Sequence, residues 1–218
     1  MSAPSDPSPS KSAELPRLRC HRAQLGSLTA NPDAGPWPGI APIELRETVT
    51  GASPEQSTTL RVAWNDHELR VLFCAIDSNP WATHTERDAP LYDEEVFEVF
   101  LDPVGDLKSY FEFEVNPLNA VLDLIIRRNR SGLVKNFKWQ CDNLRTAVLR
   151  TADGWNGEFS IPFRSLIAAP PQPGDRWRAN FYRIDRPTGR EWELSAWSPT
   201  GQPKFHMPEC FGILEFAG

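Results

Sequence analysis

The sequence predicts an all-β fold, an antiparallel β-sandwich of jelly-roll or immunoglobulin type with roughly ten strands. Short apolar runs alternate with turn residues along the chain, and no long stretch has the 3.6-residue period of a helix. The 218 residues are 40% hydrophobic and 24% charged, which is typical of a globular protein. This length suits one large β domain, and we expect a monomer.

The distribution of proline predicts the structure of the N-terminal segment. Of the 21 prolines, eight lie in the first 42 residues. Residues 1–13 are rich in Ser, Pro and Ala, so we expect a disordered arm there and one domain over residues 14–218. From residue 14 to Pro42 we expect extended segments that wrap the domain, with Trp37 as an anchor, because proline disfavours both helices and central strands.

Residues 58–76 have the pattern of a β-hairpin. Leu60, Val62 and Trp64 alternate with other residues, and Asn65-Asp66 supplies a turn. The run LRVLFCAI that follows is apolar on both faces, so we expect this strand to be buried on both sides. Other alternating runs predict further strands at 95–101, 110–116, 121–127, 145–150, 155–162, 176–184, 191–197 and 211–216.

Charge and composition exclude several classes of partner. The net charge is −6 and the pI about 5.3, with no basic stripe, so we expect no nucleic acid. No apolar run is long enough to span a bilayer, and MSAPSDPSPS lacks the layout of a secretory signal; we expect neither a membrane span nor a signal peptide, and the compartment stays open. The four cysteines form no metal or redox motif: Cys20, Cys74, Cys141 and Cys210.

Negative charge is concentrated between residues 86 and 116. This segment holds ten acidic and two basic residues, a net charge of −8, so the rest of the chain sums to +2. Within YFEFEVN, alternation places Glu112, Glu114 and Asn116 on the face opposite the phenylalanines. Glu98 shares its face with apolar neighbours, which is unfavourable unless the carboxylate is paired or faces a wet cleft.

Three interpretations compete for this acidic face. Glu112 and Glu114 could form the solvated face of an outer strand, as is usual in antiparallel sheets. The carboxylates could instead bind calcium, with weak candidates at Asp77, Asp88, Asp93 and Asp102. In the third interpretation, carboxylates and Asn116 accept hydrogen bonds from sugar hydroxyls beside stacked aromatic rings.

Several segments together resemble the family 9 carbohydrate-binding modules and their relatives. They are LRVAWNDHELRVLFCAID, NPWATHTERDAPLYDEEVFEVFLDP, YFEFEVNPLNAVLDL, WNGEFSIPFRSL, PGDRWRANFYRID, WELSAWSP and HMPECFGILEF. Their order covers residues 27–216. The resemblance implies a β-sandwich that binds oligo- or polysaccharides without cleaving them, that acts with glycoside hydrolases in carbohydrate catabolism, and that frequently holds calcium.

The resemblance also implies a site. Family members clamp a sugar ring between two tryptophans, and the matching positions here are Tyr92 and Phe205, whose smaller rings stack less area. Glu98 and Asn116 match polar positions of the family's site, whereas Glu114 stands where an arginine is expected. The loop residue Trp81 and the cleft residue His206 complete the candidate set.

Other classes remain as alternatives. Glu98 with Glu112 or Glu114 could form the carboxylate pair of a glycoside hydrolase, although no serine elbow, His-Glu-x-x-His or phosphate loop is present. A protein-interaction module with a decayed sugar site is a further alternative. We expect no haem, because His206 and Met207 are adjacent and point in opposite directions in an extended segment.

Overall fold

The computed structural model describes residues 14–187, 189 and 191–218, so the arm expected at residues 1–13 lies outside the described residues. The described chain is all-β, as predicted: it contains strands and short 3-10 turns but no α-helix. No helix among the described residues has the length and apolar character needed to cross a bilayer. The 3-10 turns are η1 (Trp37–Gly39), η2 (Leu91–Asp93), η3 (Phe163–Ser165) and η4 (Pro208–Cys210).

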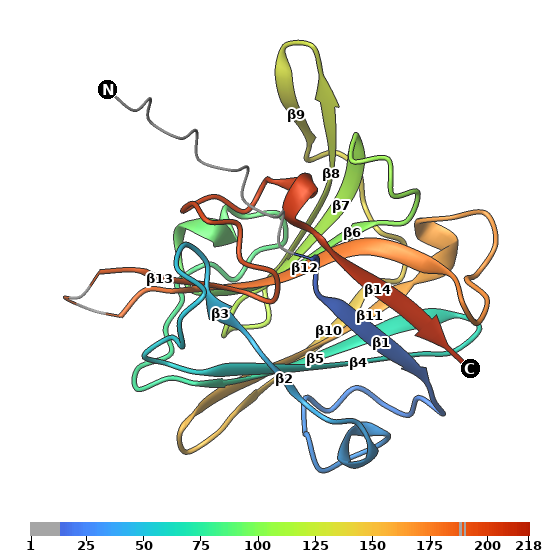
Figure 1. Ribbon diagram of the computed structural model, residues 1–218. Coiled ribbons are helices and arrows are strands. Elements are labelled where there is room, and N and C mark those ends of the chain that lie inside the picture. The colour runs from blue at the N-terminus through green and yellow to red at the C-terminus, as the bar shows by residue number, and fades with distance from the viewer. Residues whose placement is uncertain (1–13, 188, 190) are drawn as a thin grey trace, which may run out of the picture.

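Fourteen strands in the described chain form one hydrogen-bonded sheet, and eleven of them follow one another in a continuous path of pairing (Figure 1). Its order is β10-β11-β5-β4-β1-β14-β12-β6-β7-β8-β9, with β2, β3 and β13 attached at the side. The strands are β1 (Arg17–Arg22), β2 (Ile43–Glu44), β3 (Arg46–Glu47), β4 (Thr58–Trp64), β5 (Glu68–Ile76), β6 (Val96–Asp102), β7 (Ser109–Val115), β8 (Val121–Asn129), β9 (Gly132–Asn136), β10 (Arg145–Arg150), β11 (Gly154–Pro162), β12 (Arg176–Asp185), β13 (Glu193–Ala196) and β14 (Gly212–Ala217).

The path folds over on itself to make a sandwich. Phe73 on β5 stacks on Phe97 of β6 with ring centroids 4.6 Å apart, although several strands separate β5 and β6 in the pairing order. Phe97 also stacks on Trp155 of β11 at 3.9 Å. These contacts cross from one layer to the other, so the main core lies between β10-β11-β5-β4 and β12-β6-β7-β8.

All ten predicted strands are present, but the N-terminal segment corrects one expectation. We expected residues 14–42 only to wrap the domain, yet RLRCHR forms β1, a central strand that pairs in parallel with β14 and β4. This run follows Pro16 and is itself free of proline, so it can pair on both edges. In Figure 1, β1 and β14 lie side by side although they come from opposite ends of the chain. Trp37 is buried, as its expected anchoring role requires.

A second apolar cluster covers the outer face of β6, β7, β8 and β12. The alternation along these strands is as predicted: Phe113 points into the main core, while Phe100 and Tyr110 belong to the outer cluster. Residues of the segment 86–95 and of the segment 198–211, including Leu91 and Phe205, pack on this face. A face that would otherwise contact solvent is therefore partly buried, and the acidic side chains of the same face are buried with it.

Candidate functional site

A cavity of about 570 Å³ opens on the outer face beside β6, β12 and β13. It brings together four residues that the sequence analysis singled out from distant parts of the chain: Tyr92, Glu98, Phe205 and His206. The other lining residues are mainly apolar or basic, namely Asp93, Leu133, Ile184, Arg186, Trp192, Leu194, Pro203 and Lys204. This mixture of aromatic rings and a few polar groups is typical of pockets for small polar ligands.

Sheet register explains why Glu98 lies at the centre of this face. Glu98 is directly opposite Tyr182 of β12 on one side and Glu114 of β7 on the other. Tyr182 in turn pairs with Ala196 of β13. Because side chains in register share a face, these four residues form one row across the sheet, and Glu98 is the member of the row that reaches the cavity.

Phe205 is a fixed wall of the cavity. Its ring stacks on that of Tyr182, with centroids 4.1 Å apart and planes 14° apart, and it is 9% exposed. The Tyr182 hydroxyl donates a hydrogen bond to the Phe205 carbonyl oxygen at 2.9 Å and accepts one from the Asn180 amide at 2.7 Å. Phe205 is therefore held by its ring and by its backbone, with one face of the ring covered by Tyr182.

Tyr92 lies on η2 at the opposite side of the cavity and is partly exposed. The Arg186 guanidinium donates a hydrogen bond to the Tyr92 carbonyl oxygen at 2.8 Å, and the Lys135 ammonium lies 5.5 Å from the centroid of the Tyr92 ring. Burial raises the pKa of the Tyr92 hydroxyl, and the nearby Asp93, Glu114 and Glu112 carboxylates raise it further. Tyr92 thus stays protonated and can donate a hydrogen bond at neutral pH.

Trp192 is the aromatic residue that the sequence analysis missed. It is 58% exposed, it lines the cavity, and the Arg186 guanidinium lies 3.1 Å from its ring centroid. A cation over an indole is an attractive contact that also fixes the ring. Alternation gave a signal, since Trp192 shares its face with Leu194, and Leu194 lines the same cavity.

Two of the predicted site residues, Trp81 and Asn116, do not line the cavity. The Trp81 indole N–H donates a hydrogen bond to the Arg186 carbonyl oxygen at 2.5 Å, and Trp81 is not among the cavity's lining residues. Asn116 is buried in the turn after β7, where its amide donates to the His84 carbonyl oxygen and its Oδ1 accepts from the Ala120 N–H at 2.9 Å. Asn116 therefore stabilises the turn after β7 and is not among the residues that line the cavity.

Glu98, Glu112 and Glu114 form a buried carboxylate trio at the floor of this face. Each offers an oxygen within 4.8 Å of the others, and all three are buried, so the interpretation of Glu112 and Glu114 as a solvated face is wrong. Burial raises the pKa of each carboxyl group, and the neighbouring carboxylates raise those of Glu98 and Glu114 further. The covering segments explain the error, because strand alternation does not show what packs on a face.

His206 lines the cavity and lies next to Glu112 of the trio. Its Nδ1 is 2.9 Å from the Tyr110 hydroxyl and 3.9 Å from Oε2 of Glu112. Burial and the nearby Lys135 ammonium lower the pKa of the imidazole to about 3, so the ring is neutral at pH 7. His206 consequently gives the trio no compensating positive charge.

With this geometry in place, the comparisons identify the family. The family model described as carbohydrate-binding family 9 matches residues 52–216. The chain belongs to carbohydrate-binding family 9. Its similarity to solved members of the fold extends over the whole domain, because the family 9 module of Caldicellulosiruptor kristjanssonii in complex with glucose has a TM-score of 0.70 and 16% identity, with 93% of this chain and 96% of that chain covered.

Two further proteins resemble this family 9 chain. A putative carbohydrate-binding protein of Bacteroides uniformis has a TM-score of 0.74 and 18% identity, with 92% of this chain and 98% of that chain covered. A protein of Arthroderma benhamiae described as an extracellular protein is 26% identical over 196 residues, which cover 83% of this chain and 87% of that protein. The structural similarity confirms the predicted sandwich fold.

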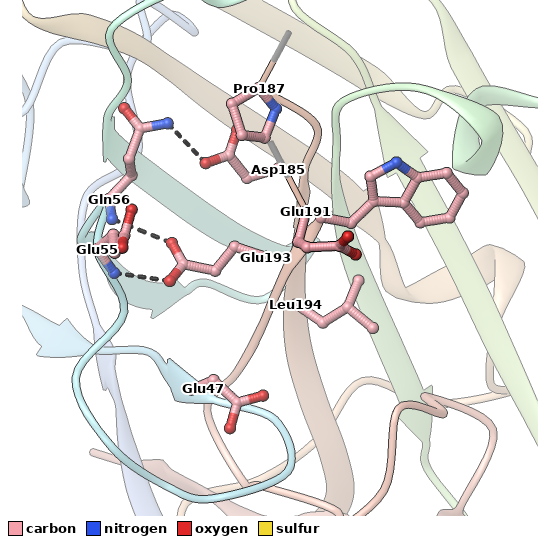
Figure 2. Close-up of a pocket in the computed structure, with 9 residues that line it drawn as sticks. Glu47, Glu55, Gln56, Asp185, Pro187, Glu191, Glu193 and Leu194 are labelled. Carbon is pink, nitrogen blue, oxygen red and sulfur yellow. Dashed lines mark hydrogen bonds between the residues drawn. The ribbon is translucent and has the colours of Figure 1, made fainter. Parts of the chain in front are cut away.

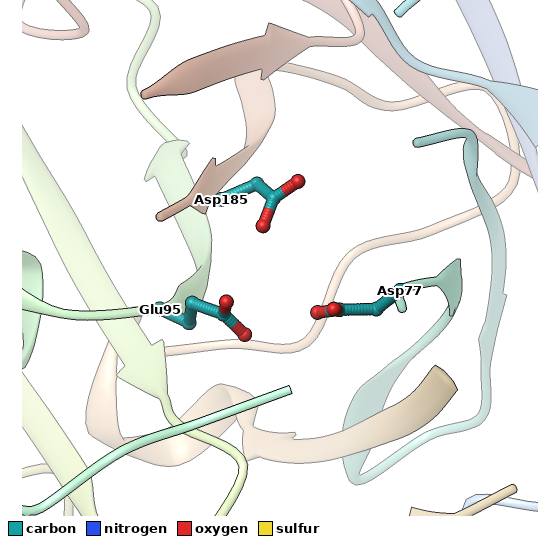
Figure 3. A group of neighbouring side chains, drawn as sticks. All are labelled: Asp77, Glu95 and Asp185. Atoms are coloured by element: carbon teal, nitrogen blue, oxygen red, sulfur yellow. The ribbon is translucent and has the colours of Figure 1, made fainter. Parts of the chain in front are cut away.

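A second carboxylate cluster has the ligands that calcium prefers. Asp77, Glu95 and Asp185 are buried and their side chains converge (Figure 3), each offering an oxygen within 4.8 Å of the others. Arg183 supplies one positive charge, with its Nη2 2.7 Å from Asp77 and 3.4 Å from Asp185. One oxygen each of Glu95 and Asp185 has no hydrogen-bond partner among the described residues, so this family 9 chain could hold a calcium ion there.

The pKa of Glu95 reflects the crowding in this cluster. Burial, followed by contact with Asp77 and the charges of Asp77 and Asp185, raises it to about 9. The other aspartates suggested by the sequence lie elsewhere. Asp102 accepts hydrogen bonds from two backbone N–H groups of its own turn, and Asp88 accepts one from Gln140.

A second cavity, of about 530 Å³, shares Trp192 and Leu194 with the first and is lined mostly by acidic residues (Figure 2). Two of its carboxylates accept hydrogen bonds from the segment before β4. The Glu193 carboxylate accepts from the backbone N–H groups of Glu55 and Gln56 at 2.6 and 3.0 Å, and Asp185 accepts from the Gln56 amide at 2.7 Å. These contacts tie the β13 end of the sandwich to the segment before β4, which is a structural role.

Proposed function

We propose that this family 9 chain is a non-catalytic carbohydrate-binding module that binds a glucose-type sugar ring in the cavity between Tyr92, Phe205 and Trp192. Family membership and the cavity support the proposal together. The cavity's volume of about 570 Å³ is in the range of small-ligand pockets. The solved family 9 structures contain glucose and cellotriose, which makes gluco-oligosaccharides the first ligands to test.

The lining residues suit a sugar ring. Tyr92, Trp192 and Phe205 offer aromatic surface for the apolar C–H surface of a pyranose. Glu98 accepts hydrogen bonds from hydroxyls at the floor, while the Tyr92 hydroxyl can donate one. The observation that carries the proposal is the convergence of these aromatic residues and Glu98 on one cavity from four separate segments of the chain.

Geometry does not favour the hydrolase alternative. Retaining glycosidases hold two carboxyl groups about 5–5.5 Å apart and inverting enzymes about 6.5–9.5 Å apart, on either side of the scissile bond. Glu98 lines the cavity, whereas Glu112 and Glu114 are buried on the same face of the sheet and do not line it. A sugar in the cavity would meet Glu98 from one side, with the other two carboxylates behind it.

Isothermal titration with glucose, cellobiose, cellotriose and xylotriose tests the proposal. We expect saturable binding of a gluco-oligosaccharide, weakened in Tyr92→Ala by about 1–3 kcal/mol because a stacking face is lost. Phe137→Ala is the matched control, since Phe137 is also an exposed aromatic residue but lines none of the described cavities. Absence of binding to every sugar, or equal affinity of Tyr92→Ala and wild type, would refute the assignment and favour a protein-interaction module.

A further inference from the structure

Every other buried carboxylate of the described chain accepts a hydrogen bond from a protein donor, as the following contacts show. Glu158 is bound by Arg70, Asp123 by Arg87, and Asp77 by Arg183. The remaining buried carboxylates also accept hydrogen bonds, namely Glu68, Glu94, Glu95, Asp102 and Asp185. The trio is different, because both carboxylate oxygens of Glu114 and Oε2 of Glu112 are buried without a hydrogen-bond partner among the described residues.

No positive side chain compensates the trio either. Among the described residues, no Lys or Arg nitrogen forms an ion pair with Glu98, Glu112 or Glu114. The nearest basic influence is Lys135, which lies on the exposed strand β9 over the Tyr92 ring. A buried charged carboxylate without a partner is unfavourable by several kcal/mol, so three together, two of them directly opposite in the sheet, are neutralised either by protons or by a bound cation.

The arrangement also has the geometry of a cation site. Three carboxylate oxygens lie within 4.8 Å of one another, and Glu98 borders the cavity while Glu112 and Glu114 lie behind it. All the available ligands are hard oxygens, which favours calcium over transition metals. Calcium takes six to eight oxygens, so three carboxylates would leave coordination positions open toward the cavity.

We propose that Glu98, Glu112 and Glu114 hold a divalent cation, calcium by preference, at the floor of the cavity, where sugar hydroxyls complete its coordination. The cation provides the counter-charge that the fold lacks at this point. It also accounts for the position of Glu114 directly opposite Glu98 in the buried row behind the cavity. The coordination of sugar hydroxyls by the cation rests on the proposed function, whereas the binding of the cation itself does not.

Calcium titration of the full chain, freed of metal with chelator and dialysed, tests the cation site without any sugar. The Asp185→Asn background removes a ligand of the other cluster, so that one site is measured. We expect saturable calcium binding that Glu114→Gln and Glu98→Gln each weaken by about tenfold or more. The matched control is Glu86→Gln, which makes the same change of charge at an exposed residue outside both clusters.

Folding of the variants is checked independently. Glu114→Gln has the same shape and removes an unpartnered buried charge, so its melting temperature in chelator should equal or exceed that of the parent. Failure of calcium to bind the parent, or equal binding by the parent and a well-folded Glu114→Gln, would overturn the cation site. The same titration with magnesium should give weaker binding, because magnesium gives up its water shell reluctantly.

Sugar titrations in calcium and in chelator then separate the two proposals. Tighter sugar binding in calcium than in chelator, lost in Glu114→Gln, supports the coordination of sugar by the cation. Equal sugar binding in both buffers would overturn that coordination and leave the sugar site standing. Calcium binding without any sugar binding would overturn the proposed function and leave the cation site standing.

Discussion

Phe205→Ala should strongly lower the free energy of unfolding, because Phe205 is a packed residue of the apolar cluster and not a loosely held surface ring. Phe205 is 9% exposed, stacks on Tyr182 at 4.1 Å and belongs to the outer apolar cluster with Phe100 and Phe211. Truncation of a buried phenylalanine to alanine typically lowers the free energy of unfolding by about 3–5 kcal/mol. For a chain of this length, 1 kcal/mol shifts the melting temperature by about 2–4 °C, so the expected decrease is about 6–20 °C.

Differential scanning calorimetry of purified Phe205→Ala measures this decrease, in chelator so that cation binding does not contribute. Tyr92→Ala should lower the melting temperature by less than half as much, because Tyr92 is partly exposed and lacks the stacked partner of Phe205. Phe137→Ala serves as the exposed aromatic control. A shift below about 2 °C for Phe205→Ala would refute the reasoning, since it would mean that the packing of the ring on Tyr182 contributes little to the free energy of unfolding.

Two further predictions concern the surroundings of the cavity. In a Glu114→Gln background, calcium at about 100 times its dissociation constant should raise the melting temperature by about 5–11 °C by binding to the cluster of Asp77, Glu95 and Asp185. Adding Asp185→Asn should remove that rise, measured against the same protein without metal. Equal shifts in the two proteins would contradict the assignment. Asn116→Ala should lower the free energy of unfolding by about 1–3 kcal/mol in urea titrations, because the buried Ala120 N–H loses its acceptor, and an unchanged urea midpoint would show that the turn does not depend on this amide.

The fold was predictable because period-2 alternation is a local property. The hairpin of β4 and β5, and the opposite orientations of Phe113 and Glu114 on β7, follow from neighbouring residues alone. The burial of Glu114 does not, because it depends on segments 86–95 and 198–211 that pack over the outer face. The parallel pairing of β1 with β14 joins the two ends of the chain, and nothing within RLRCHR specifies such a distant partner.

The candidate site was predictable in part for the same reason. Resemblance to the family pointed to Tyr92, Glu98 and Phe205, which the structure places around one cavity. It gave no position for Trp192, whose exposure depends on how the end of β13 meets the loop that carries Arg186. Resemblance also does not show that one face of the Phe205 ring is stacked on Tyr182, whereas Tyr92 has no such aromatic partner among the described residues.

The row of Glu98 and Glu114 differs from the rest of the outer face, because it places buried acidic side chains where the pattern of the strands favours apolar ones. Elsewhere on the outer face the same strands carry apolar residues that pack together, such as Phe100. In the other layer, the buried carboxylate of Glu158 on β11 forms an ion pair with Arg70 of β5. Like charges directly opposite in a sheet oppose pairing, and apolar side chains there would stabilise this face. Because such departures from local consistency concentrate at functional sites, the unanswered carboxylates are better explained by a bound ligand than by the requirements of folding.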